Sequence, residues 1–132
     1  MRLPALLAAA LLAGCAGNAA APCALGQQAA ILDTLYFGTA RPHGAVTPPE
    51  WDGFVRDEIA PRFPQGFSLL EAQGQWRNAD GSTAHEPSHV LQVAHPADAQ
   101  SERDLGEIVE RYKARFGQDA VLRLRTAACM SL

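Results

Sequence analysis

The sequence predicts a single α+β domain with the element order β-α-β-β-α-β. The chain has 132 residues, of which 48% are hydrophobic and 19% charged. This composition suits one compact domain and is too apolar for a disordered chain. Two segments carry apolar residues at helical spacing, and four others alternate apolar with polar residues or concentrate β-branched and aromatic ones. The order of these segments along the chain predicts the fold class.

The first half of the domain predicts a strand followed by a helix. Residues 31–37 are rich in β-branched and aromatic side chains and stop at Gly38, which is typical of a strand. Thr47 and Glu50 have the spacing of a capping box, and Pro48 suits the first helical position. The helix then presents an apolar stripe and ends before two prolines; the stripe is Trp51, Phe54, Val55 and Ile59.

The second half predicts two strands, a helix and a last strand. Residues 67–76 and 88–95 read as strands on either side of a turn that contains Asp80-Gly81, a strong hairpin signal. We expect Ser101 with Asp104 to cap the second helix and Gly117 to end it. Its apolar stripe is Leu105, Ile108, Val109, Tyr112 and Phe116. Residues 120–127 alternate again and predict the last strand.

This order is that of the ferredoxin-like arrangement, a four-stranded antiparallel sheet with two helices on one face. The other face must then meet water, a partner or a ligand. Strand parity predicts which side chains form this candidate binding face, with Tyr36 or Phe37 from the first strand according to register: Tyr36, Glu71, Gln73, Gln75, Gln92, Arg123 and Arg125. This combination of aromatic, amide and arginine side chains suits a homodimer interface or a site for an anionic small molecule, since arginine binds carboxylates well. The alternative is a face that contacts only water.

The N-terminus has the pattern of a bacterial lipoprotein signal. Arg2 precedes a short apolar run, residues 3–12, which has the layout of a secretory signal peptide. Leu12-Ala13-Gly14-Cys15 then resembles a lipobox, in which the cysteine is lipidated. We therefore expect a signal peptide over 1–14, a lipidated tether over 15–28 and the domain over 29–132. The alternative is an ordinary signal peptide.

A lipid anchor at Cys15 would make the membrane a partner and place the protein in the cell envelope. In a Gram-negative host, Ala16 after the cysteine favours the periplasmic side of the outer membrane. Two further cysteines remain in this oxidising compartment, where disulfides persist. In the expected strand order the last strand lies beside the first, which brings Cys129 near Cys23. We therefore expect a Cys23–Cys129 disulfide.

One motif matches a metalloprotease signature but does not fit its chemistry. His85-Glu86-Pro87-Ser88-His89 has the H-E-x-x-H pattern, which binds zinc only on a helix. Pro87 would break that helix, and in a strand the two histidines lie ~13 Å apart. We expect no metal or cofactor. His43 and His95 are expected to be solvated loop residues, and Trp51 and Trp76 to be core anchors.

Several segments together resemble a bacterial family catalogued as domain of unknown function 3574. The resemblance covers roughly residue 35 to the C-terminus, and the segments match in order. They are Leu35-Tyr36-Phe37-Gly38, Trp51 with Phe54, Pro61-Arg62-Phe63-Pro64 with Gly66, Gly74-Gln75-Trp76, Glu86 with Ser88, and Tyr112-Lys113 with Phe116 and Gln118. The family has no assigned activity, so the resemblance implies no catalytic residues.

Two classes of function therefore stay open. A formal charge of −3 without a basic cluster excludes nucleic acid as an expected partner. The first hypothesis is a non-catalytic module that binds a small molecule or protein on the uncovered sheet face. The second is a small ferredoxin-like enzyme, such as a cofactor-independent oxygenase or isomerase, which rests on fold analogy alone. The residues favour the binding module.

Overall fold

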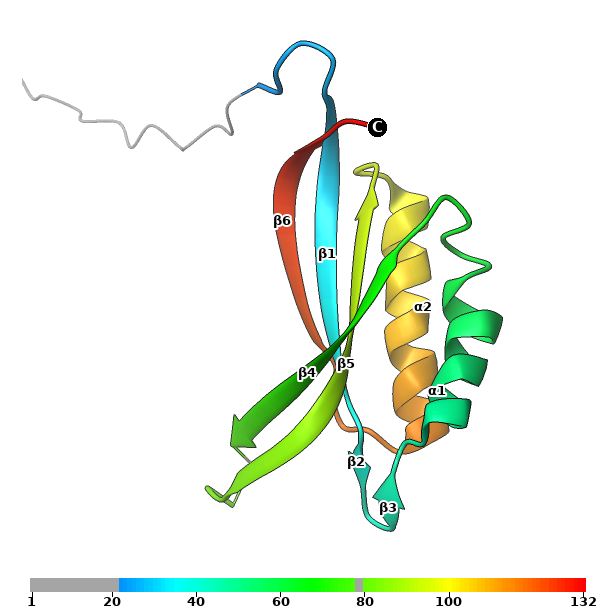
Figure 1. Cartoon of the computed structure of the whole chain (residues 1–132), viewed down its shortest axis with the longest axis vertical. Helices are drawn as coiled ribbons and strands as arrows, with labels where there is room; N and C mark the ends of the chain where they lie inside the picture. The colour runs from blue at the N-terminus through cyan, green and yellow to red at the C-terminus, as the bar shows by residue number, and fades with distance from the viewer. Residues whose placement is uncertain (1–21, 78–79) are drawn as a thin grey trace, which may run out of the picture.

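The computed structural model describes residues 22–77 and 80–132 and shows an antiparallel sheet with two helices on one of its faces (Figure 1). The expected α+β architecture is confirmed. Its elements in order are β1 (Gln28–Gly38), β2 (Ala40–Arg41), β3 (Gly44–Ala45), α1 (Pro48–Phe54), η1 (Val55–Ile59), β4 (Ser68–Arg77), β5 (Thr83–His95), α2 (Ala99–Phe116) and β6 (Leu122–Met130).

The sheet has the strand order β4-β5-β1-β6, and every neighbouring pair is antiparallel. The short strands β2 and β3 form a separate hairpin. Tyr36 is the Cα partner of Val90 on β5 and of Leu122 on β6. Because partners in register point to the same side, these pairs assign every strand residue to a face.

The hydrophobic core lies between the sheet and the helices. Phe37 of β1 packs edge-on against Tyr112 of α2, with ring centroids 4.7 Å apart, and tilted against Trp51 of α1 at 5.4 Å. The Tyr112 hydroxyl donates to the Gly38 carbonyl at 2.9 Å. Burial raises the pKa of Tyr112, and the charge of Glu86 adds to the shift. Tyr112 and Trp51 are thus core residues, as expected.

The predicted capping box is present at the start of α1, whereas the cap of α2 differs from the prediction. The Glu50 carboxylate accepts from the backbone N–H of Thr47 and from its hydroxyl, both at 2.8 Å. The second helix is capped by Asp98, which accepts from the Ser101 N–H at 2.7 Å, and not by Ser101 with Asp104. Its helix ends at Gly117, whose φ of 64° is left-handed.

The hairpin of β4 and β5 extends beyond the rest of the sheet. The pairing of β1 with β5 ends at Gly38 and Ser88, whereas the β4–β5 pairs continue from Gln73–Pro87 to Arg77–Thr83. We call these last five pairs the arm. Figure 1 shows the arm projecting away from α1 and α2. None of the helices in the described ranges is long and apolar enough to cross a membrane.

Candidate functional site

The face of the sheet that lacks helices is apolar rather than charged. A row of Cα partners crosses all four strands and points to this side: Leu70, Val90, Tyr36 and Leu122. Leu124 lies on the same face. The side chains of Leu70, Leu122 and Leu124 are 47%, 41% and 49% exposed. We call this surface the uncovered face and the four residues its apolar row.

Of the seven side chains expected on this face, the structure places only Tyr36 and Gln92 there. Glu71, Gln73, Gln75, Arg123 and Arg125 are on the helix side. For Gln73 and Gln75 the expectation fails because the arm lies beyond the helices, so its apolar residues have no core to face. Oε1 of Glu71 instead lies 2.7 Å from Nδ1 of His89. The ring of His89 stacks on the ring of Trp51, with ring centroids 4.3 Å apart.

On β6 the expectation fails because both arginines pair with a buried carboxylate. Asp33 of β1 is fully buried. Arg123 donates to it from Nε at 2.8 Å and from Nη2 at 3.0 Å, and Arg125 donates from Nη2 at 3.2 Å. Glu102 of α2 accepts from both arginines on their outer side. The arginines therefore neutralise a charge inside the domain and are not a ligand site.

His95 completes this cluster, although the sequence predicts a solvated loop residue. It is 4% exposed, with Nε2 at 2.7 Å from Asp33 Oδ2 and Nδ1 at 2.7 Å from the Pro96 carbonyl oxygen. The ring of His95 therefore links the buried carboxylate to the backbone at the end of β5. We refer to Asp33, His95, Arg123, Arg125 and Glu102 as the Asp33 cluster.

The Asp33 cluster is electrostatically satisfied. Burial alone would raise the pKa of Asp33, but hydrogen bonds from Arg123, His95 and Arg125 outweigh it and lower the pKa to about 2. The hydrogen bond to Asp33 raises the pKa of Arg123, and hydrogen bonds from Arg123 and Arg125 lower the pKa of Glu102. Every charge has a partner, so the cluster stabilises the fold rather than offering a reactive group.

The H-E-x-x-H motif lies on β5, as the proline predicts. His85 is exposed on the arm, whereas His89 is buried against Trp51. No group of three or more His, Cys, Asp or Glu side chains in residues 22–77 and 80–132 is arranged to hold a metal ion. The motif is therefore part of a strand with separate roles for its two histidines.

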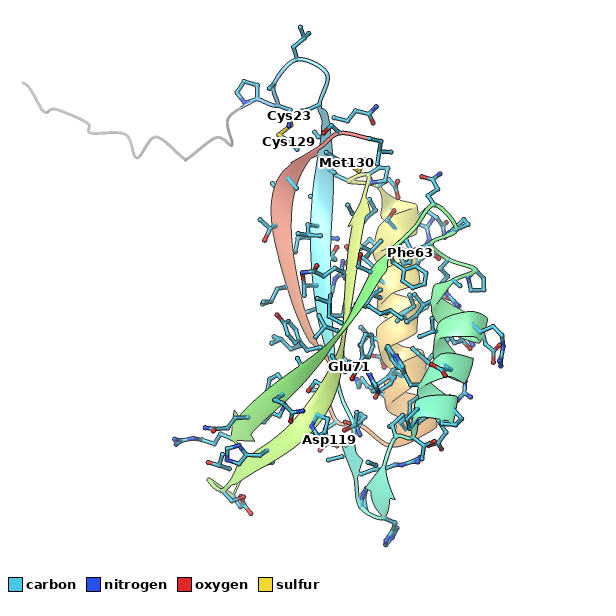
Figure 2. All side chains as sticks on the ribbon, viewed as in Figure 1. Cys23, Phe63, Glu71, Asp119, Cys129 and Met130 are labelled. Carbon is cyan, nitrogen blue, oxygen red and sulfur yellow. A yellow bond between two sulfur atoms is a disulfide. The ribbon has the colours of Figure 1, made fainter. Side chains whose placement is uncertain are left out.

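The expected disulfide is present between Cys23 and Cys129, whose Cα atoms are 5.5 Å apart. Figure 2 shows the pair at the end of the sheet where β1 begins. Residues 23–28, which the sequence assigns to the tether, are thus joined to β6, and β1 itself begins at Gln28. The predicted lipidation site, Cys15, lies outside the described residues.

A cavity of about 650 Å³ opens where the arm leaves the sheet. We call it the arm cavity. Its walls come from the end of β1, from the arm and from the segment that leads into β6: Tyr36, Gly38, Ala40, Trp76, Arg77, Ala84, Glu86, Gln118, Asp119, Ala120, Val121 and Leu122. Figure 2 labels Asp119 near the base of the arm. Tyr36 and Leu122 belong both to the cavity wall and to the apolar row.

Glu86 is held in the cavity wall by the backbone of the β1 end. Its Oε2 accepts from the Ala40 N–H at 2.6 Å, and the Ala40 carbonyl accepts from Gln118 Nε2 at 2.5 Å. A Cβ on Gly38 would lie 2.7 Å from Glu86 Oε1, closer than real contacts allow. Gly38 therefore provides the space in which the carboxylate sits. Sequence reasoning missed this site, although the strand-ending glycine was a signal.

Two buried polar atoms beside the cavity lack hydrogen-bond partners in the described part of the chain. They are Nε1 of Trp76 and Oγ of Ser88. Trp76 lies over Gly74, where an added Cβ would come within 2.8 Å of Nε1 and 3.0 Å of Ser88 Oγ. Trp76 is thus an aromatic side chain on the uncovered side of the arm and not the expected core anchor. An ordered water is one partner that can satisfy buried polar atoms of this kind.

One known protein family matches most of the chain in sequence. The model of a family described as protein of unknown function, DUF3574, matches residues 32–132. The chain belongs to the DUF3574 family. No curated protein matches it in sequence. The matched range spans the sheet from β1 to β6, the Asp33 cluster and the arm cavity, so each belongs to the DUF3574 domain.

Two solved proteins resemble the DUF3574 domain in structure. A phage SAM lyase in complex with S-methyl-5′-thioadenosine has a TM-score of 0.59 at 12% identity and covers 86% of this chain and 96% of its own. CutA from Synechococcus elongatus has a TM-score of 0.53 at 12% identity and covers 80% of this chain and 83% of its own. At this identity the likeness concerns the fold, which is of the ferredoxin-like α+β class.

Proposed function

We propose that the protein is a binding module that takes up a small planar molecule in the arm cavity, at the end of the uncovered face. The observation that carries this proposal is the combination of an aromatic wall with a fixed carboxylate. Trp76 and Tyr36 offer ring surfaces, and Glu86 is held by Ala40. The volume lies within the ~300–1,000 Å³ that is usual for ligand pockets.

The cavity suits a ligand that donates hydrogen bonds. Glu86 and Asp119 are acceptors when ionised, and Glu86 Oε1 is left for a ligand after Oε2 has bonded to Ala40. A planar ring with hydroxyl or N–H groups, such as a nucleoside, would stack on the aromatic wall and donate to these carboxylates. The nucleoside thioether bound by the similar phage enzyme has this chemistry and is a suitable first probe.

Binding is favoured over catalysis by the state of the ionisable groups. A catalytic group is usually desolvated in a closed cavity. The buried ionisable groups with large pKa shifts are Asp33 and Tyr112, and both are engaged in structural hydrogen bonds. Asp119 in the cavity wall is exposed. Among residues 22–77 and 80–132, the small-enzyme alternative therefore has no desolvated reactive group in its support.

We expect S-methyl-5′-thioadenosine or adenosine to bind saturably, as followed by calorimetry. Glu86→Gln should weaken the affinity about 10-fold or more, because a hydrogen bond to a charged group is worth ~1.5–3 kcal/mol. Trp76→Ala should weaken it by a similar factor through lost stacking. The matched control is Glu71→Gln, a carboxylate at the base of the arm on the opposite face.

Two results would count against this function. The cavity proposal fails if no nucleoside binds saturably, or if Glu71→Gln weakens binding as much as Glu86→Gln. Mass spectrometry of the probe after incubation separates the two hypotheses, because a binding module returns it intact. Conversion to a new product would instead support the enzyme alternative.

We also propose that the module is carried on a lipid anchor at Cys15 in the cell envelope. The support is the lipobox pattern that precedes the domain. In the native host, mass spectrometry of the membrane-extracted protein should show a diacylglycerol-scale increment on Cys15. Cys15→Ser should move the protein into the soluble fraction, whereas Cys23→Ser should leave it in the membrane. A soluble, unmodified parent protein would contradict the anchor.

A further inference from the structure

The apolar row is a continuous surface rather than a set of scattered side chains. Leu70, Val90, Tyr36 and Leu122 follow one another as Cα partners from one edge of the sheet to the other. Leu32 lies on the same side of β1, and Leu124 lies there on β6. Monomeric soluble proteins rarely expose large contiguous apolar patches. We therefore expect another molecule to cover the uncovered face.

The charged residues on the uncovered face indicate which kind of molecule could cover it. Among the described strand residues that point to this side, Glu86 is the only charged one, and it lies on the arm. The ionic groups of the Asp33 cluster lie on the helix side. A face without cations attracts neither an anionic ligand nor anionic lipid headgroups. Its chemistry matches another apolar face of the same kind.

The size of the face matches what a stable dimer buries. β1 has 11 residues, which makes it ~36 Å long at ~3.3 Å per residue. Four strands at ~4.8 Å spacing make a sheet ~19 Å wide, so the footprint is up to ~700 Å². Standard protein interfaces bury ~800 Å² on each partner. One copy of the sheet could therefore cover the other almost completely.

We propose that a second copy of this chain covers the uncovered face, sheet against sheet. Both helix layers would then lie outside, and the two apolar rows would form a second core between sheets packed ~10 Å apart. Such a contact uses the same patch on both copies and closes as a two-fold dimer. Because Tyr36 and Leu122 also line the arm cavity, the second copy would border that cavity. The proposal does not depend on the ligand.

The test exploits two adjacent leucines of β4 that differ in the face they occupy. Leu70 is 47% exposed on the uncovered face, and Leu69 is 40% exposed on the helix side, where it pairs with Leu91. Sedimentation velocity is measured over a range of concentrations on the full chain carrying Cys15→Ser, with Leu70→Glu or Leu69→Glu added. Circular dichroism checks that each variant is folded.

We expect the parent protein to sediment as a dimer. Leu70→Glu should raise the dimer dissociation constant at least about 100-fold, because each copy then places an unpaired carboxylate within the apolar interface. Leu69→Glu should change the dissociation constant less than about 3-fold. Leu124→Glu on β6 is the second variant and should act like Leu70→Glu, including where Leu70→Glu fails to fold.

Several outcomes overturn the proposal. A parent that stays monomeric over the whole concentration range overturns it, as does a dimer that survives both Leu70→Glu and Leu124→Glu. Equal weakening by Leu69→Glu and Leu70→Glu overturns it as well, because the interface would not be the uncovered face. A monomer that binds phosphatidylglycerol vesicles through Leu70 would make this face a membrane surface instead.

Discussion

Asp33→Ala is expected to lower the free energy of unfolding by about 3–5 kcal/mol, because it breaks a buried ion pair by removing one of its partners. Asp33 is fully buried and accepts from Arg123, Arg125 and His95. Urea denaturation followed by circular dichroism measures the loss. Arg125→Ala is the control, because its side chain is 45% exposed and its removal leaves Arg123 and His95 on Asp33. It should cost less than about 1 kcal/mol.

The same carboxylate predicts how stability changes in acid. The folded pKa of Asp33 is about 2, below its ordinary value of 3.8. The stabilisation is therefore complete above about pH 4 and is lost as the pH falls through about 2, and it amounts to about 2 kcal/mol. Asp33→Ala should lack this part of the acid sensitivity. An Asp33→Ala protein as stable as the parent, with the same pH profile, would show that the cluster contributes nothing.

Removal of the Cys23–Cys129 disulfide is the second change with a large expected effect. The bridge joins residues 106 apart in sequence. The chain-entropy description gives up to ~4–5 kcal/mol for a loop of this length, since the bridge restricts the unfolded chain. For a domain of this size each kcal/mol corresponds to ~4–8 °C, so the melting temperature should fall by up to about 16–40 °C.

The experiment compares Cys23→Ser/Cys129→Ser with its parent in a Cys15→Ser background, where no third thiol can exchange. Reduction of the parent with dithiothreitol should lower its melting temperature to that of the double variant. The double variant itself should not respond to the reductant, which serves as the control. A double variant that melts within a few degrees of the oxidised parent would contradict the expected loop effect.

The element order could be predicted from sequence because each element carries its own local signal. The apolar stripe around Leu105, Ile108 and Tyr112 defines α2, and Gly117 ends it in a left-handed conformation. The disulfide could be predicted because it follows from strand order, which places Cys129 beside the start of β1. These inferences need only the chain and the general rules of packing.

The side chains of the uncovered face could not be predicted, because strand parity alone does not say which side of the sheet the helices cover. The usual rule directs apolar residues inward, but on both edge strands it is inverted. Leu70 on β4 and Leu122 on β6 point away from the helices. One signal was present in the sequence. Asp33 is the one charged residue of its strand, and a buried carboxylate needs cations, which Arg123 and Arg125 offer on the neighbouring strand β6.

The disulfide would also have a mechanical consequence if the domain is held by the proposed anchor at Cys15. Tension that arrives along the chain reaches Cys23 before it reaches β1, and the bridge divides it between β1 and β6. β1 is an inner strand, hydrogen-bonded to β5 on one side and to β6 on the other. The pull is therefore resisted by two strands loaded together along their length, in shear, and β1 cannot be peeled out alone. The arm projects from the other end of the sheet, away from the disulfide (Figure 1).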